Sequence, residues 1–117
     1  PLLIRDGRIE RAGLGVVLLE DAKARSIGVT EGAVVHFVAP TGSAAAAGIL
    51  PLYQDAAGWL HADVIVAIDG RKIRKSQDVP DALEGRKVGD KVEISLLRDG
   101  KPATVSITLQ SLNRPFR

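Results

Sequence analysis

The clearest pattern along the chain is an alternation of apolar and polar residues over 91–110. Two alternating runs, "KVEISLLR" and "KPATVSIT", flank Asp99-Gly100, and this arrangement predicts a β-hairpin. A second Asp-Gly pair inside "DVIVAIDGRKI" (63–73) predicts a strand, a turn and a short return strand. Continuous apolar runs predict two further buried strands, over 15–20 and 33–39.

Short helices are predicted where a capping residue precedes, and a glycine follows, a few residues without alternation. They are 21–28 closed by Gly28, a helix between the N-cap Ser43 and Gly48, and 76–85 capped by Ser76 and stopped by Gly85. The segment "ILPLYQDAAGWLHA" (49–62) has no regular period and is predicted to be a loop. Five or six short strands with two or three short helices predict one α+β domain on a partly closed antiparallel sheet.

Composition narrows the class of protein. The 117 residues are 45% hydrophobic and 26% charged, the balance of a globular domain, and only 3% are aromatic, so the core must be aliphatic. The absence of cysteine excludes disulfides and thiolate chemistry. No apolar run approaches the length of a membrane span. The net charge is +2, and the one dense basic run, "RKIRK" (71–75), alternates like a solvated strand end, so no nucleic-acid partner and no membrane insertion are expected.

Enzyme chemistry has no candidate constellation. His36 lies within a predicted strand, where partial burial is expected, and His61 lies in the predicted loop beside Asp63. Neither is near a serine in a nucleophile turn. His61-x-Asp63 alone is a weak metal signal. We therefore expect no catalytic residue, no metal and no cofactor in this chain.

The stretch "RAGLGVVLLE" (11–20) places two glycines before a predicted strand. A dinucleotide-binding loop is excluded, because Leu18 stands where its third glycine would be and a strand, not a helix, follows. Glycine permits backbone angles that turn successive N–H groups the same way, and such a nest binds a carboxylate. The strand edge beyond it could pair with a peptide backbone, with helix 76–85 completing a groove.

The loop "GLGV" resembles the carboxylate-binding loop of PDZ domains. The stretches "GAVVHFVAPTGSAAAAGI" and "ADVIVAIDGRKIRKSQDVPDALEGRKVGDKVEISLLRDGKPATVSITL" resemble the PDZ domain that follows the trypsin-like protease domain of the HtrA/Deg family. The resemblance covers residues 11–110 and implies a PDZ fold with the permuted strand order of bacterial members. It makes 1–10 a linker from an upstream protease domain and 111–117 a tail.

The resemblance also implies a binding site. The N–H groups of Leu14, Gly15 and Val16 would hold a ligand's terminal carboxylate, with Arg11 as a cationic helper and Arg8 behind it. The pocket for the last side chain of the ligand would comprise Leu14, Val16, Leu18, Ser76, Pro80 and Leu83. Helical spacing places Ser76, Pro80 and Leu83 on one face, with Val79 and Ala82 toward the core.

Other interpretations stay open at these positions. The apolar strand residues could be plain core, Arg11 could be a solvated charge, and Ser76 is first a helix cap. Gly13 stands where many relatives carry a bulky aromatic residue, which could weaken affinity. Family members usually have glycine at Ala62. The longer 49–62 insertion carries Tyr53 and Trp59; a surface loop anchored by both aromatics is favoured over a contact with the protease domain or a neighbouring subunit.

The implied function is that of a peptide-binding module in a serine endopeptidase of protein quality control. Its partners would be C-terminal peptides of unfolded proteins or an activating peptide, bound with micromolar or weaker affinity, and the upstream protease domain of a homo-oligomeric parent in the bacterial periplasm. One alternative is a structural or oligomerisation domain with an unused groove. Another is the PDZ domain of a different membrane or processing protease.

Overall fold

The computed structural model describes residues 3–5, 8–10, 12–40 and 42–111. The first half of the described chain holds β1 (Leu3–Arg5), β2 (Arg8–Glu10), β3 (Ala12–Gly13), β4 (Val16–Leu18), α1 (Asp21–Ser26), β5 (Ala33–Val38), α2 (Ser43–Ala46) and β6 (Tyr53–Gln54). The second half holds β7 (Leu60–His61), β8 (Asp63–Ile68), β9 (Arg71–Lys72), α3 (Asp78–Leu83), β10 (Lys91–Arg98), β11 (Lys101–Thr108) and β12 (Gln110–Ser111).

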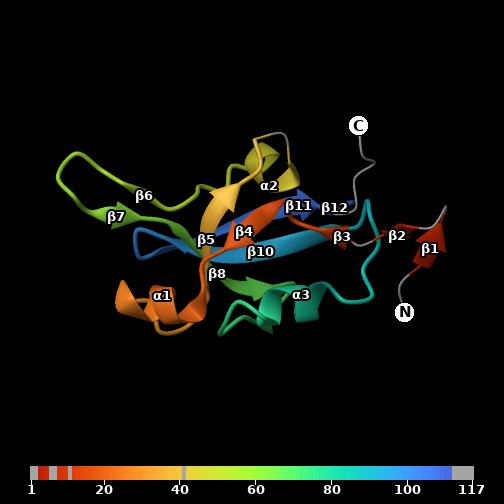
Figure 1. Ribbon diagram of the computed structural model, residues 1–117, viewed down its shortest axis with the longest axis horizontal. Helices are drawn as coiled ribbons and strands as arrows, with labels where there is room; N and C mark the ends of the chain where they lie inside the picture. Colours follow the sequence, from red (N-terminus) through yellow and green to blue (C-terminus); the bar gives the residue numbers. More distant parts are fainter. Residues whose placement is uncertain (1–2, 6–7, 11, 41, 112–117) are drawn as a thin grey trace.

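One six-stranded antiparallel sheet organises the molecule (Figure 1). Its strand order is β11-β10-β8-β5-β4, with β9 paired to β8. Within the described residues the sheet is open, with β11 and β4 at its edges, whereas the sequence predicted partial closure into a barrel. The α+β class and the antiparallel pairing are confirmed. The same described residues contain no helix both long and apolar enough to cross a bilayer.

Both predicted Asp-Gly turns are confirmed. β10 and β11 pair along their whole length, and the turn between them has φ +54° at Asp99 and +77° at Gly100. Asp69 and Gly70 have φ +49° and +82° in the turn between β8 and β9. Positive φ at both central residues matches the twist of the flanking strands, and Asp-Gly tolerates it at low cost.

The predicted helix stops are confirmed, but the predicted N-caps are wrong. Positive φ at Gly28, Gly48 and Gly85 follows the ends of α1, α2 and α3. Ser43 is instead the first residue of α2, and its N–H donates to the side chain of Gln110. Ser76 lies two residues before α3 and bonds to Asp21. Both serines thus bond to residues far away in the sequence instead of capping the helix that follows them.

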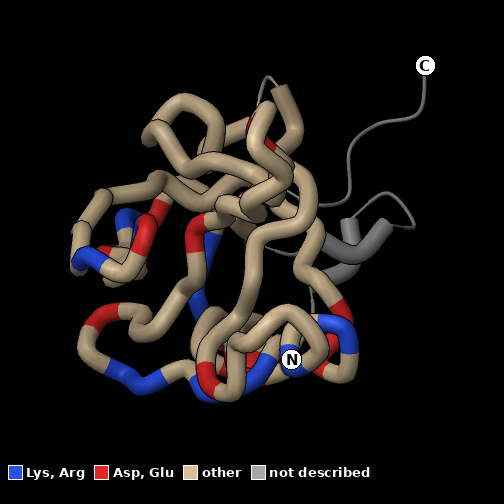
Figure 2. Tube along the Cα trace, turned by 90° about the vertical axis from the view of Figure 1, so that its left-hand side faces the viewer, with Lys and Arg blue, Asp and Glu red and all other residues tan. Residues whose placement is uncertain are grey.

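The core is aliphatic, as the composition predicts. A large buried cluster joins β5, β8, β10, β11 and α3, and a smaller one, Leu19, Ala24 and Val34, lies beside α1. In the "RKIRK" run the alternation is confirmed, since Ile73 is buried between exposed basic residues. Figure 2 shows Lys and Arg interleaved with Asp and Glu along the trace, so the charges do not separate onto two faces.

Two local expectations are wrong. His36 is exposed rather than partly buried, because β5 carries a bulge that shifts the register between Phe37 and Val35 and turns the intervening side chain outward. The 49–62 segment is not a plain loop. It contains the hairpin β6–β7, with Tyr53 opposite His61, and this hairpin extends to the left in Figure 1, at the end of the molecule far from β1 and β2.

Candidate functional site

The strand β4 has a neighbour on one side only, in the part of the chain that the structure describes. The C=O of Gly15 accepts a hydrogen bond from the N–H of Ala39 at 3.0 Å. This bond flanks the opposed residues Val16 and Val38, so they form a non-hydrogen-bonded pair of the antiparallel ladder. The N–H and C=O of Val16 therefore point away from β5, toward the open edge.

The same geometry recurs two residues later. The N–H of Leu19 donates to the C=O of Val34 at 2.9 Å, and this bond flanks the opposed pair Leu18 and Val35. The backbone groups of Leu18 thus also face the open edge. Alternate residues of β4, Val16 and Leu18, present the donor and acceptor pattern that an added antiparallel strand would use.

The loop before β4 turns its N–H groups outward. The C=O of Leu14 accepts from the N–H of Ala44 at 3.1 Å, and the C=O of Gly15 is bonded to Ala39. In a trans peptide plane the N–H points opposite to the C=O, so the N–H groups of Gly15 and Val16 point away from Ala44 and Ala39. The geometry therefore suits two of the three predicted carboxylate donors; the N–H of Leu14 stays a prediction.

Gly15 is the position in this loop where glycine is required. Its φ is +79°, and a Cβ there would lie 2.8 Å from Oε1 of Gln110. Gln110 accepts a hydrogen bond from the N–H of Ser43, and its backbone pairs with Gly13 in β3. The loop is thus held by a residue almost a hundred positions away. Sequence reasoning missed Gln110, because a lone polar residue after a strand carries no distinguishing signal.

The four apolar residues of the predicted pocket belong to one neighbourhood. Leu14 is 3% exposed and is buried in the large core cluster together with Leu83, while Val16 and Leu18 are half-buried against that cluster. The helix α3 packs against β3, directly before the loop. The structure therefore brings the strand and helix residues to one cluster, although a role in ligand binding stays a prediction for each.

The expected division of helix faces is not observed. Leu83 is buried together with Val79 and Ala82, and Pro80 is exposed. Ser76 lies outside the helix, where its N–H and Oγ both donate to the carboxylate of Asp21, at 2.9 and 3.2 Å. The helix is shorter than predicted, six residues from Asp78 to Leu83, so Ser76 does not share a helical face with Pro80 and Leu83. Arg11 lies outside the described residues.

The opposite face of this edge carries an apolar pair that sequence reasoning did not single out. Val17 and Phe37 are directly opposed across β4 and β5, and they are 54% and 53% exposed. The alternation in β4 could have indicated Val17, but the bulge that exposes Phe37 could not be read from the sequence.

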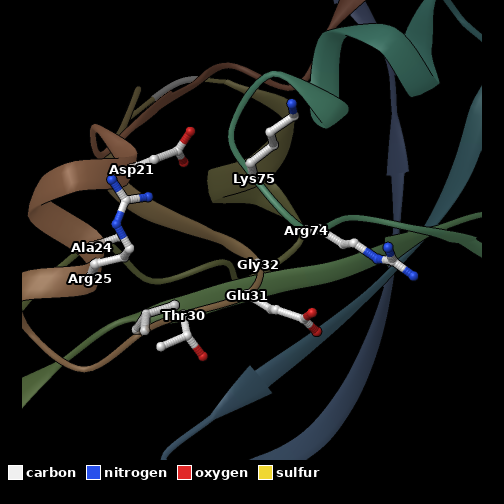
Figure 3. A pocket seen from close by; sticks show the side chains of 9 residues that line it. Asp21, Ala24, Arg25, Thr30, Glu31, Gly32, Arg74 and Lys75 are labelled. Atoms are coloured by element: carbon white, nitrogen blue, oxygen red, sulfur yellow. The ribbon is translucent and has the colours of Figure 1, made fainter.

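Two surface concavities of the described residues lie elsewhere. One lies between α1 and the segment after β9, and Figure 3 shows that Arg74 points away from Arg25 and Lys75, so its cations do not converge on one point. The second is more apolar and lies beside the β6–β7 hairpin. Neither involves the predicted pocket residues.

His61 and Asp63, the pair considered as metal ligands, each bond to other residues. Asp63 is 1% exposed and forms a bidentate ion pair with Arg98 at 2.7 and 2.8 Å, which raises the pKa of the arginine. His61 bonds instead to Asp55 and Asp99. Among the described residues, no three His, Asp or Glu side chains are grouped to hold a metal.

The predicted anchoring of the insertion by its aromatics is wrong for Trp59, which is 72% exposed. Tyr53 stacks on His61, with ring centroids 4.9 Å apart. An exposed Trp59 leaves a contact with another domain or subunit as a prediction.

The sequence is similar to parts of known proteases. It is 32% identical over 109 residues to protease Do-like 1, chloroplastic, of Arabidopsis thaliana. The matched region is 92% of this chain and 25% of that protein. The chain is 34% identical over 112 residues to the periplasmic serine endoprotease DegP of Salmonella typhimurium, covering 92% of this chain and 22% of that protein. The chain thus spans about a quarter of the length of these relatives.

Solved structures give the same result. The structure of the HtrA-type protease AlgW with a decapeptide superposes on this chain with a TM-score of 0.68 at 28% sequence identity. The match covers 96% of this chain and 32% of the AlgW chain. The HtrA3 PDZ domain bound to a phage-derived ligand shares the fold over 89% of both chains, with a TM-score of 0.66 at 18% identity. The PDZ domain family model matches residues 12–109. The chain therefore belongs to the PDZ domain family, as its resemblance to HtrA/Deg members indicated.

Proposed function

We propose that this chain is the peptide-binding module of a Deg/HtrA-like serine endopeptidase and that it captures C-terminal segments by adding them as a strand to β4. One observation carries the proposal. The backbone groups of Val16 and Leu18 face an open sheet edge, directly after a loop whose N–H groups at Gly15 and Val16 point outward.

The chemistry follows from these two features. An ionised C-terminus accepts charge-assisted hydrogen bonds from the outward N–H groups of the loop, with Arg11 as an additional cation. The preceding residues of the ligand then continue the ladder along β4. Apolar contact with Leu14, Val16, Leu18 and Leu83, with Ser76 and Pro80 at the rim, would favour ligands that end in Val, Leu, Ala or Phe.

The role in the parent protein is part of the same proposal. The relatives are serine endoproteases, and the AlgW structure was solved with a decapeptide. We infer that residues 1–10 lead from a protease domain that holds the catalytic residues, and that binding of a peptide regulates this domain in protein quality control. The relatives include periplasmic and chloroplastic proteins; the periplasm and a homo-oligomeric parent remain our proposal.

Peptide titrations of the 117-residue chain test the proposal. Free-acid peptides that end in Val or Leu are expected to bind with micromolar or weaker dissociation constants. Amidation should lower affinity about tenfold or more, because it removes a charge-assisted interaction. N-methylation of the ligand amides that pair with β4 should have a similar effect, whereas N-methylation at the alternate amides should not.

Two protein variants separate the pocket from the outer face. Leu83 is buried in the core, so a charge there would unfold the domain; Leu18→Asp at the half-buried edge position is the better choice. We expect loss of binding with a retained circular-dichroism spectrum. Val17→Asp, on the exposed outer face of the same strand, is the matched control and should bind normally. If neither peptide form binds and the chain self-associates in sedimentation, the structural alternative replaces the proposal.

A further inference from the structure

One histidine joins the β6–β7 hairpin to the main sheet. The Nε2 atom of His61 lies 2.8 Å from Oδ2 of Asp55, which belongs to the hairpin. The Nδ1 atom lies 2.8 Å from Oδ1 of Asp99, in the turn between β10 and β11. The ring stacks on Tyr53 at an interplanar angle of 18°. The imidazole is 26% exposed, so solvent reaches this junction and can exchange protons with it.

The two contacts fix the number of protons on the ring. An ionised carboxylate only accepts hydrogen bonds, so both ring nitrogens must donate, and only the imidazolium does so. A neutral imidazole keeps one N–H and would present a lone pair to the other carboxylate. The hydrogen bonds that His61 donates to Asp55 and Asp99 accordingly raise the pKa of His61, and the bond from His61 lowers the pKa of Asp55.

We propose that His61 is a proton-operated latch, which holds the β6–β7 hairpin against the β10–β11 turn when the imidazole is charged and releases it when the imidazole is neutral. The contact that opens is the one to Asp99. Asp55 stays with the hairpin, because its Oδ1 accepts hydrogen bonds from the N–H groups of Ala57 and Trp59, both at 2.9 Å.

The charges around the ring support this assignment. The hairpin contributes Asp55 and the phenol of Tyr53, and the β10–β11 turn contributes Asp99. From β10, Arg98 lies near Asp99, but its guanidinium is bound to Asp63 at the start of β8. The segment after α1 contributes the apolar side chains of Ile27 and Val29 to the same concavity. The two carboxylates are therefore the groups that decide the charge of His61.

The latch controls a specific surface. A concavity of about 220 Å³ is lined by apolar residues of the segment after α1, of β5, β8 and β10 and of the hairpin, and His61 and Asp99 also line it. The hairpin also presents Trp59 and Leu60 to solvent. A charged His61 keeps this side of the concavity closed and the two apolar side chains in fixed positions, and release at higher pH lets the hairpin move as a unit.

The experiment follows Trp59 and His61 together between pH 5 and 8.5. Trp59 is the only tryptophan in the chain, so its anisotropy decay reports the hairpin directly. We expect one transition to faster motion as the pH rises, with the same midpoint as the NMR titration of the His61 ring, and above the ordinary imidazole value of about 6.5.

Variants make the test decisive. In His61→Gln the transition should disappear. In Asp99→Asn, which keeps a residue tolerant of φ +54° but removes the charge, the midpoint should move to lower pH. Asp69→Asn changes the equivalent Asp-Gly turn, whose carboxylate pairs with Arg86, and should leave the transition unchanged. A transition that survives His61→Gln, a wild-type hairpin insensitive to the titration of His61, or an unmoved midpoint in Asp99→Asn overturns the latch.

Discussion

The β4 edge and the β6–β7 hairpin are two exposed regions held in place by different forces. The side chains behind β4 pack on the large aliphatic core, and its loop carbonyls are bonded to backbone N–H groups. The hairpin instead exposes Tyr53, Trp59 and Leu60, and within the described residues its apolar packing is limited to Leu52 and Ala62 at its base. Its polar side-chain contacts to the rest of the domain include those of His61 with Asp99 and, at the base, of Asp63 with the N–H of Leu50.

This difference determines which conditions affect each region. Burial of aliphatic side chains does not depend on pH and is little affected by salt. An exposed contact between charged groups weakens with salt and is lost when either group changes its protonation state. We therefore expect the peptide-binding edge to keep its geometry under conditions that loosen the hairpin.

The largest effect should come from the base of the hairpin. Asp63→Ala leaves Arg98 and the N–H of Leu50 without their carboxylate partner. Breaking a buried ion pair costs about 3–5 kcal/mol, and we expect the lower end because the Arg98 side chain is 38% exposed. Urea unfolding measures the loss. Glu31→Ala, which breaks the exposed pair with Lys72, is the control and should change stability by about 0–1 kcal/mol.

The same substitution, glycine to alanine at a position with positive φ, can be made in both regions. Gly15 and Gly58 have φ of +79° and +92°. Alanine at either position should cost about 1–2 kcal/mol, because an L-residue is strained in the left-handed region. At Gly15 the clash of the new Cβ with Gln110 adds to this cost, whereas at Gly58 the new Cβ would make only an ordinary contact with Gln54, at 3.8 Å. Only Gly15→Ala should also weaken free-acid peptide binding, by about tenfold, the equivalent of one charge-assisted hydrogen bond. Equal affinities of the two variants would separate the loop from ligand binding.

The smallest effect is the pH dependence of stability. Because the folded pKa of His61 is raised, its contribution is fully present below about pH 6.5 and is lost as the pH rises through the folded pKa. Because the folded pKa of Asp55 is lowered, its contribution is present above about pH 3.9 and is lost as the pH falls through the folded value. The difference in unfolding free energy between wild type and His61→Gln, measured across this range, should therefore shrink toward alkaline pH. A constant difference would mean that His61 contributes through packing alone.

Much of the fold could be predicted from local signals. The Asp99-Gly100 and Asp69-Gly70 turns, the alternating strands around them and the glycine stops of three helices all depend on neighbouring residues in the chain. Several of the predictions that failed involve a distant partner or a distant strand. Ser43 and Ser76 look like N-caps, but Gln110 and Asp21 engage them, and a bulge in β5 exposes His36.

The binding site divides in the same way. The glycines of "RAGLGVVLLE" identified the loop, because positive φ at one position is a local requirement that a sequence records. That the N–H groups of Gly15 and Val16 point outward depends on Ala44 and Ala39, and this could not be read from the loop itself.

By itself the sequence determined the class of the domain, its main hairpins, its aliphatic core and the loop before β4. Only the tertiary structure decided that β4 is an edge strand, that 49–62 forms a hairpin, and that His61 meets Asp99 from 38 residues away. The physical reason is the range of the interactions. Turns and alternation depend on backbone torsions of adjacent residues, whereas an open edge or a pair of charges exists only once the whole sheet has assembled.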